Sequence, residues 1–204
     1  MNKKIIAFSG ACGSGKSTLI RNIAKNVEGS VIIDDPIRDV LFEFGTNIVE
    51  ARKNISLWCA IQRKVMNIRY ANIDMCDADV ILLDRAPADI MYYTDLITES
   101  NQGLRLDTRW QRLREEQKKH CDWLAKRIRT VVRVEPFKNV SDNVTGDHNR
   151  PNIGTYSNRL SEYGGIVSHE FCLDYVDEYN IERVNIEGKS HETIWNEINH
   201  IFIK

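Results

Sequence analysis

Residues 10–17 read GACGSGKS and fit the pattern G-x-x-x-x-G-K-[ST], with Thr18 directly after it. A short apolar run precedes this stretch, and a helix-like run follows it. Glycine in a regular element costs stability, so three glycines here indicate that the backbone itself must come close to something. Successive N–H groups of a tight loop form a nest for an anion, and the dipole of the following helix favours negative charge. The pattern therefore predicts a phosphate-binding loop between a strand and a helix.

The side chains of this loop suit the tail of a nucleoside triphosphate. Lys16 can bridge the β- and γ-phosphates, and the hydroxyl of Ser17 can bind Mg²⁺. We therefore predict ATP and Mg²⁺ as the cofactors. The residues predicted to bind them are Gly10, Cys12, Gly13, Ser14, Gly15, Lys16, Ser17 and Thr18. The competing interpretation is a glycine-rich surface turn that carries a lysine by chance. Cys12 is either a small residue that fits the loop or a redox switch at the start of the helix.

Apolar runs along the rest of the chain predict the fold class. Strands are expected at residues 4–10, 30–35, 79–85, 130–136 and 182–188. They alternate little, as strands covered on both faces do. Helix-like periodicity is found at residues 16–27, 55–73, 104–128 and 190–203, the last opened by Ser190 as N-cap. The alternation predicts an α/β fold, with a parallel sheet of about five strands covered by helices on both faces, in one domain over residues 1–204.

Composition narrows the class of function. The net charge is −1, so no overall positive field draws the chain to nucleic acid. The five cysteines are scattered without a C-x-x-C pair, which favours reduced thiols in a cytoplasmic protein over a zinc site. No apolar run approaches the roughly 20 residues of a membrane span, and residues 1–10 are typical of a first strand rather than a signal peptide. A small-molecule partner is expected and a membrane partner is not, while a homodimer is left open.

Charged residues follow the second expected strand, at the edge where ligands of parallel sheets bind. Asp34 and Asp35 end the strand, Pro36 follows, and Arg38 comes three residues after Asp35. A carboxylate here can accept the proton of an attacking hydroxyl or orient a sugar hydroxyl, and the arginine can hold phosphate. A structural interpretation is compatible with this, namely an acidic N-cap with Pro36 in the first helical position. We predict Asp35 and Arg38 as catalytic residues and Asp34 as a substrate contact.

A second charged pair ends the third expected strand. Asp84 can hold Mg²⁺, and Arg85 can stabilise the charge of a transferred phosphoryl group, so both are predicted to be catalytic. The alternative for Asp84 is a strand-end cap. Asp89 and Tyr92 follow on the next expected helix and are predicted to reach the acceptor. Gln62 interrupts an apolar helical face, and its amide needs partners that either a base edge or nearby backbone can supply.

Taken together, GACGSGKST, DDPIR, Gln62 and LLDRAPAD resemble the P-loop nucleoside and nucleotide kinases. The deoxynucleoside kinases are similar in their acidic residue and proline, helical glutamine and acidic-arginine pair, and thymidylate kinase is similar in the Asp-Arg pair. The spacing of Asp35 and Arg38 resembles that of the nicotinamide riboside kinase domain and of polynucleotide 5′-kinase. The resemblance implies a P-loop NTPase fold, Asp35 or Asp34 as the catalytic base, and Asp84 and Arg85 near Mg²⁺ and the acceptor. The chain departs from the deoxynucleoside kinases in carrying Asp for Glu, and Ala86 where Ser is usual.

Kinases of this kind exclude water with a mobile lid that carries arginines. Residues 105–159 are the candidate lid, because residues 105–133 hold ten Lys or Arg against four Asp or Glu, and the polar stretch that follows adds Arg150 as a substrate contact. The alternative for the helical part is a solvated basic face. The loop after the fifth strand, around Gly188 and Lys189, is predicted to contribute to an adenine site.

The sequence therefore predicts a kinase that transfers the γ-phosphoryl group of ATP to a nucleoside or (deoxy)nucleoside monophosphate, mainly by positioning and electrostatic stabilisation. One alternative is a kinase acting on a hydroxyl of DNA or RNA, which the basic segment 105–133 would bind. Another is an ATP-binding switch or ATPase module, against which Asp84 is followed by Arg85 instead of the usual glutamate.

Overall fold

Five parallel strands form the central sheet, in the order β2-β3-β1-β4-β5. The structure is a computed structural model, and it describes residues 3–10, 15–87, 89–91, 94, 102–134, 180–186 and 188–202. The strands are β1 (Lys4–Ser9), β2 (Ser30–Ile33), β3 (Val80–Asp84), β4 (Ile128–Val134) and β5 (Asn180–Val184). Every neighbouring pair is parallel, so all carboxyl ends lie at one edge. The predicted α/β class and parallel sheet are confirmed.

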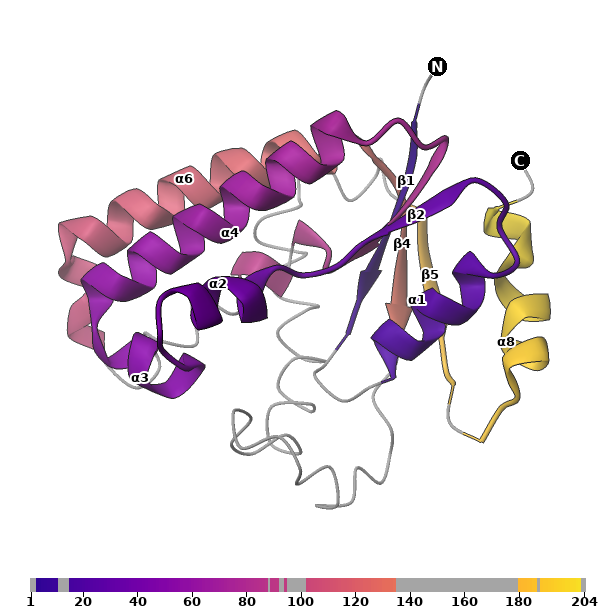
Figure 1. Cartoon of the computed structure of the whole chain (residues 1–204), viewed down its shortest axis with the longest axis horizontal. Helices are drawn as coiled ribbons and strands as arrows, with labels where there is room; N and C mark the ends of the chain where they lie inside the picture. The colour runs from indigo at the N-terminus through magenta and orange to yellow at the C-terminus, as the bar shows by residue number, and fades with distance from the viewer. Residues whose placement is uncertain are drawn as a thin grey trace.

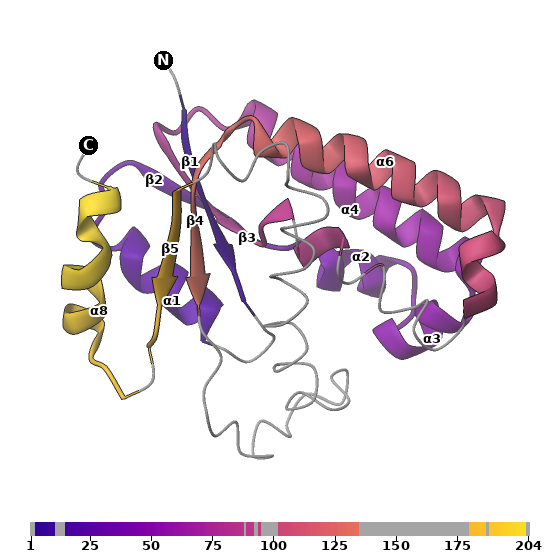
Figure 2. The same ribbon diagram turned by 180° about the vertical axis from the view of Figure 1, so that it is seen from behind.

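Helices cover both faces of this sheet (Figures 1 and 2). The described α-helices are α1 (Lys16–Ala24), α2 (Ile37–Glu43), α3 (Ile48–Lys53), α4 (Ile55–Met75), α6 (Thr108–Ala125) and α8 (His191–Ile198). The described residues also form the short 3-10 helices η1 (Gln102–Leu106) and η3 (Asn199–Ile201). Residues of α1 and α8 pack against one face, and the C-terminal parts of α4 and α6 pack against the other.

Strand β1 shows how the sheet is anchored between these layers. Successive side chains of a strand point to opposite faces. Ile6 and Phe8 accordingly belong to the core cluster with α1 and α8, whereas Ile5 and Ala7 belong to the cluster with α4 and α6. All four are at most 2% exposed, and burying a side chain of the size of Ile or Phe stabilises the fold by about 1.5–3 kcal/mol. The strand that leads into the predicted phosphate-binding loop is therefore fixed from both sides.

The N-terminal parts of α4 and α6 extend beyond the sheet, where they pack with α2 and α3 (Figure 1). We call this part of the molecule the helical lobe. It has its own apolar core, formed by Val40, Ala51, Trp58, Cys59, Ile61, Val65, Met66 and Leu113. Asn47 caps α3 and Asn54 caps α4, each accepting hydrogen bonds from two backbone N–H groups of the first turn. Because α2 begins four residues after the last residue of β2, the helical lobe starts at the carboxyl edge of the sheet.

The helix expected at residues 104–128 is divided in the structure. The carboxylate of Asp107 accepts a hydrogen bond of 2.8 Å from the backbone N–H of Arg109, so α6 begins only at Thr108 and η1 precedes it. Leu106, expected on the apolar face of that helix, is instead 83% exposed. A helix after Asp35 was one of the interpretations of the sequence, and α2 is present there. The short helix α3 was not predicted, because six residues are too few to show a clear helical period.

Among the described helices, none is long and apolar enough to cross a membrane. Cys59, Cys76 and Cys121 form no disulfide bond.

Candidate active site

The first helix starts where the predicted phosphate-binding loop ends. Gly10 follows β1 with φ 154°, and Gly15 precedes α1 with φ 79°. These are backbone conformations that side chains with a Cβ disfavour, which explains glycine at both positions. Among the described residues, no side chain caps the N-terminus of α1. Residues 11–14, which include Cys12, Gly13 and Ser14, lie outside the described residues, and Thr18 is exposed on α1.

Lys16 and Ser17 both contact the carboxylate of Asp84. The Nζ atom of Lys16 lies 2.7 Å from Oδ1 of Asp84, and the Ser17 hydroxyl donates a hydrogen bond of 2.9 Å to Oδ2. Asp84 ends β3, where its register pairs it with Phe8 of β1. Lys16 and Asp84 are 5% and 6% exposed. The ends of β1 and β3 therefore bring an ammonium, a hydroxyl and a carboxylate together at the start of α1.

Opposite charges offset the burial of this group. Burial alone would raise the pKa of Asp84, but Lys16 and Arg85, with hydrogen bonds from Lys16 and Ser17, hold that pKa below its ordinary value. Burial and the positive charge of Arg85 lower the pKa of Lys16, while Asp84 opposes the change. Asp84 is consequently a carboxylate at neutral pH, the form in which it can serve a metal ion or a cation.

The oxygen donors of this cluster fit Mg²⁺. Mg²⁺ prefers oxygen ligands and is usually bound by one or two protein groups together with phosphate oxygens and water. The Ser17 hydroxyl and the Asp84 carboxylate, 2.9 Å apart, supply such groups. Within the described part of the chain, no three His, Cys, Asp or Glu residues gather as a metal cluster. The donor set is thus suited to a metal that is shared with a phosphate chain.

Arg85 connects this cluster to the neighbouring strand end. It is the one described non-glycine residue with a positive φ, at 91°. Its N–H donates to the carbonyl of Phe8 at 3.0 Å, and its Nη1 donates to the carbonyl of Gly10 at 3.0 Å. Its Nε lies 3.4 Å from Oδ2 of Asp35. The side chain therefore spans from the end of β1 to the residues that follow β2.

Asp35 is held from several directions. Its Oδ1 accepts a hydrogen bond of 3.3 Å from the N–H of Ile37, but the N-cap of α2 is Pro36, one residue later than the structural interpretation of the sequence placed it. The same oxygen lies 3.4 Å from Nη2 of Arg69 on α4. The Asp35 side chain remains 22% exposed, whereas Asp34 and Arg38 are exposed. The catalytic roles of Asp35 and Arg38 stay predictions.

Asp89 uses both of its oxygens inside the protein. Oδ1 accepts a hydrogen bond of 2.9 Å from the Ser9 hydroxyl, and Oδ2 accepts one of 3.0 Å from the N–H of Ala86. Asp89 is 3% exposed, and burial raises its pKa although Arg85 and Lys16 oppose the change. It ties the end of β1 to the segment after β3. Its contact with substrate stays a prediction, and Tyr92 lies outside the described residues.

Gln62 belongs to a buried polar group between α4 and α6. It is 6% exposed, and its Oε1 lies 3.4 Å from Nε2 of Gln117, which donates to it. Gln117 is 0% exposed and also donates a hydrogen bond of 2.6 Å to Oγ1 of Thr94. Gln117 and Arg69 were missed by sequence reasoning. The available signal was their position, because Gln117 interrupts an apolar helical face as Gln62 does, and Arg69 comes seven residues after Gln62 on the same face of α4.

Part of the candidate lid lies within the described residues. Helix α6 packs against α4, and several of its basic side chains are engaged locally. Arg109 contacts Asp107, and Arg112 contacts Glu116. Residues 135–159, with Arg150, lie outside the described residues. A lid at residues 105–159 stays a prediction.

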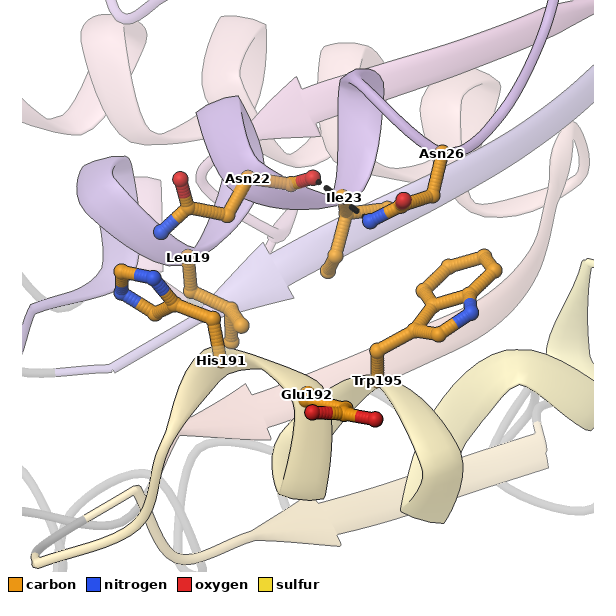
Figure 3. Close-up of a pocket in the computed structure, with 7 residues that line it drawn as sticks. All are labelled: Leu19, Asn22, Ile23, Asn26, His191, Glu192 and Trp195. Carbon is orange, nitrogen blue, oxygen red and sulfur yellow. Dashed lines mark hydrogen bonds between the residues drawn. The ribbon is translucent and has the colours of Figure 1, made fainter.

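A pocket of about 240 Å³ lies between α1 and α8 (Figure 3). Its described lining is Leu19, Asn22, Ile23, Asn26, His191, Glu192 and Trp195. The loop before α8, predicted to contribute to an adenine site, has Gly188 at φ 71°, and Lys189 pairs with Glu197 at 2.7 Å. None of the residues predicted to bind phosphate, metal or acceptor is among the lining residues, so this pocket is separate from the cluster around Asp84.

A family model described as an AAA domain (AAA_28) matches residues 5–193. The chain belongs to this AAA domain family. The match includes the loop, α1, the Asp84 cluster and the helical lobe. No curated protein matches the chain in sequence.

Solved structures agree with the AAA domain assignment at the level of the fold. NadR protein in complex with NAD and AMP-PNP aligns with 100% of this chain and 51% of its own, at 15% identity and a TM-score of 0.68. NadR in complex with NR aligns with 100% of this chain and 52% of its own, at 10% identity and a TM-score of 0.62. This chain spans about half the length of the NadR chains. Thymidylate kinase from Candida albicans aligns with 98% and 92% of the two chains at 16% identity and a TM-score of 0.48. The fold is the α/β fold of P-loop NTPases, as the sequence predicted.

Proposed function

We propose that this chain is a kinase that transfers the γ-phosphoryl group of ATP to a nucleoside or a (deoxy)nucleoside monophosphate. The observation that carries the proposal is the convergence of Lys16 and Ser17 on Asp84 at the carboxyl edge of the sheet, with Arg85 linking this cluster to Asp35. A phosphate-binding group and a candidate acceptor carboxylate thus lie at neighbouring strand ends, where parallel sheets bind ligands.

The donor side would work by neutralising charge. The ammonium of Lys16, now paired with Asp84, would contact the β- and γ-phosphates, and the backbone around Gly15 would hold phosphate oxygens. Ser17 and Asp84 would hold Mg²⁺, which neutralises charge on the phosphates when bound. Arg85 would lie beside the transferred group. Lys16 and Ser17 would exchange their contacts with Asp84 for phosphate and Mg²⁺ when ATP binds. Once ATP is bound, these groups would stabilise developing charge without further reorganisation.

The acceptor side would use Asp35. Its carboxylate remains partly exposed, so it can accept a hydrogen bond from an attacking hydroxyl or orient a sugar hydroxyl. Arg38 would add a positive charge for a phosphate on the acceptor. The amide of Gln62 would contact a base, and residues 105–159 would cover the bound substrates.

The ligands named for NadR, which are NAD, AMP-PNP and NR, support a nucleotide donor and a nucleoside-like acceptor. We therefore place nicotinamide riboside in the acceptor panel beside the nucleosides and nucleoside monophosphates. At 15% and 10% identity, the acceptor of this chain has to be determined by experiment.

A screen for ADP release tests the proposal. The full chain is incubated with ATP and Mg²⁺ and with single nucleosides, nucleoside monophosphates, nicotinamide riboside or 5′-hydroxyl oligonucleotides. ADP release that depends on a small acceptor, with the phosphorylated acceptor found by mass spectrometry, is the expected result. Release only with oligonucleotides would instead favour the nucleic-acid kinase, and release without any acceptor would favour an ATPase module.

Replacing Asp35 tests its role in the same assay. Asp35→Asn keeps the size of the side chain but removes the charge, and we expect turnover to fall about a hundredfold, the scale of general-base catalysis. ATP affinity, measured by calorimetry, should stay near the wild-type value. Asp39→Asn is the matched control, because Asp39 is an exposed acidic residue in the first turn of the same helix. Unchanged turnover in Asp35→Asn would remove Asp35 from the catalytic group.

A further inference from the structure

Arg69 is a buried arginine near the C-terminal end of α4. It is 1% exposed, and one atom, Nη2, lies 3.4 Å from Oδ1 of Asp35 and 3.4 Å from the backbone carbonyl oxygen of Asp84. Its Nε and Nη1 have no hydrogen-bond partner among the described residues. Burying a charge is unfavourable unless it is paired. The described compensation for Arg69 therefore lies entirely at the ends of β2 and β3.

Two arginines contact the carboxylate of Asp35, and they differ in how firmly they are held. Arg85 contacts Oδ2 from the loop after β3, with an 11% exposed side chain. Arg69 contacts Oδ1 from within a helix of 21 residues, between the core residues Met66 and Ile73 of the same helix. Arg85 is partly exposed at the proposed substrate site, whereas Arg69 is buried and contacts the other oxygen of the same carboxylate. Arg69 is thus placed to act as a fixed support.

We propose that Arg69 is a positioning residue, which fixes the carboxylate of Asp35 relative to the end of β3 and so relative to Asp84. The inference rests on the proposed function, in which Asp35 serves the acceptor and Asp84 serves the donor. Without Arg69, the N–H of Ile37 would hold Oδ1 of Asp35, and the tie to β3 would rest on Arg85, which contacts the other oxygen from the loop after the strand. Because Nη2 contacts groups from both strand ends, it sets the spacing between the acceptor and donor sides.

The first test compares Arg69→Met and Arg69→Lys in the full chain. A misplacement of reacting groups by about 1 Å can cost about a hundredfold in rate, so Arg69→Met should lower kcat about tenfold to a hundredfold. The KM for ATP should stay within about twofold, because the contact between Arg69 and Asp35 does not itself bind ATP. Arg69→Lys should keep the thermal midpoint near the wild-type value, with kcat between those of the wild type and Arg69→Met.

Two control variants separate positioning from general damage. Met66→Ala removes a buried side chain one turn earlier on α4, so it destabilises the same helix without touching Asp35. Arg63→Met removes a partly exposed arginine of α4 that pairs with Glu116. Neither control should lower kcat by more than about twofold, given that neither contacts the reacting groups. A fall in kcat for Met66→Ala as large as that for Arg69→Met would overturn the proposal.

A double-mutant cycle distinguishes failure of this inference from failure of the proposed function. If Arg69 acts through Asp35, then Arg69→Met adds no further loss of kcat to Asp35→Asn, because groups that act as a unit are not additive. Full additivity, with both single variants slowed, would overturn the role of Arg69 and leave that of Asp35 intact. An active Asp35→Asn would overturn both. If Arg69→Met fails to fold, Arg69→Lys supplies the same cycle.

Discussion

The donor cluster of Lys16, Ser17 and Asp84 and the polar group between α4 and α6 are both buried, but they are satisfied differently. In the donor cluster, the carboxylate of Asp84 meets an ammonium and a hydroxyl within 2.9 Å. Between the helices, Oε1 of Gln117 and Nε2 of His120 have no hydrogen-bond partner in the part of the chain that the structure describes. An unmade buried hydrogen bond costs about 1–3 kcal/mol. In the donor cluster, Oδ1 of Asp84 likewise accepts no hydrogen bond among the described residues but is compensated by the charge of Lys16, whereas the unpartnered atoms of the helix interface face no described opposite charge.

The largest effect is expected from breaking the donor cluster. Lys16→Ala removes the cation that would contact the phosphates, and we expect turnover to fall about a hundredfold to a thousandfold, the scale of losing one electrostatic contact to developing charge in a dry site. The same change leaves the buried Asp84 without its ammonium partner, so the thermal midpoint should fall as well. ADP release and calorimetric melting measure the two effects.

Lys25→Ala is the matched control for Lys16→Ala. Lys25 lies just after α1, is exposed, and contacts Asn22. Turnover should be unchanged in this variant. Retention of more than a tenth of wild-type turnover in Lys16→Ala, a loss of under 1.4 kcal/mol, would contradict the assigned donor cluster.

A smaller and more selective effect is expected at the helix interface. Gln117→Leu removes the hydrogen bonds to Gln62 and Thr94 together with the unpartnered Oε1. Gln62, which would contact the base, loses the donor that orients its amide, so the KM for the acceptor should rise roughly threefold to tenfold, the scale of one hydrogen bond of about 0.5–1.5 kcal/mol. The KM for ATP should not change, and the thermal midpoint should fall because two buried acceptors lose their donor.

Gln111→Leu, on the exposed side of α6, is the control for Gln117→Leu. Steady-state kinetics with each substrate varied in turn separates the two KM values. An equal rise in the KM for ATP would show that the helix interface does not act on the acceptor alone.

The smallest effect on turnover is expected from His120, which should act on stability. Burial, and secondarily the charge of Arg69, lower its pKa from 6.5 to about 4. As pH falls, His120 therefore becomes protonated near pH 6.5 in the unfolded chain but only near pH 4 in the folded protein. Stability from this group is fully present above pH 6.5 and is lost as pH falls toward 4. Linkage gives a loss of about 2 kcal/mol between pH 7.5 and pH 5.

His120→Phe keeps a ring beside Trp123, which stacks with His120 at 5.9 Å. Urea unfolding at pH 7.5 and pH 5 should show a smaller loss of stability in the variant than in the wild type. Equal losses in both proteins would refute the assignment to His120, and turnover at pH 7.5 should stay near the wild-type value.

The sequence predicts the donor cluster better than the helix interface, for a physical reason. Lys16 and Ser17 are placed by a strand, a loop and a helix that are consecutive in the chain, and Asp84 is placed by the end of the adjacent parallel strand. Gln117 and Arg69 gain their roles only when α6 and α4 pack together. No local sequence pattern predicts that α4 and α6 are neighbours. Polar residues on an apolar helical face mark such positions but do not name their partners.

The elements follow the same rule. The strands and the long helices were predicted because each buries a regular apolar pattern. The division of the chain at Asp107 was missed, since a single capping carboxylate ends one helix and starts another. The helical lobe was missed as a unit because its core joins five residues of α4 to one residue each of α2, α3 and α6.

The left-handed backbone of Arg85 sets two demands against each other. An L-residue in that conformation gives up about 1–2 kcal/mol of folding free energy, which glycine would largely recover. The same backbone conformation directs the Arg85 side chain along the edge of the sheet, where it contacts both Gly10 and Asp35. Stability alone therefore favours glycine at position 85, whereas the contacts with Gly10 and Asp35 require the long side chain of arginine. The chain has arginine there, between the proposed donor and acceptor sides.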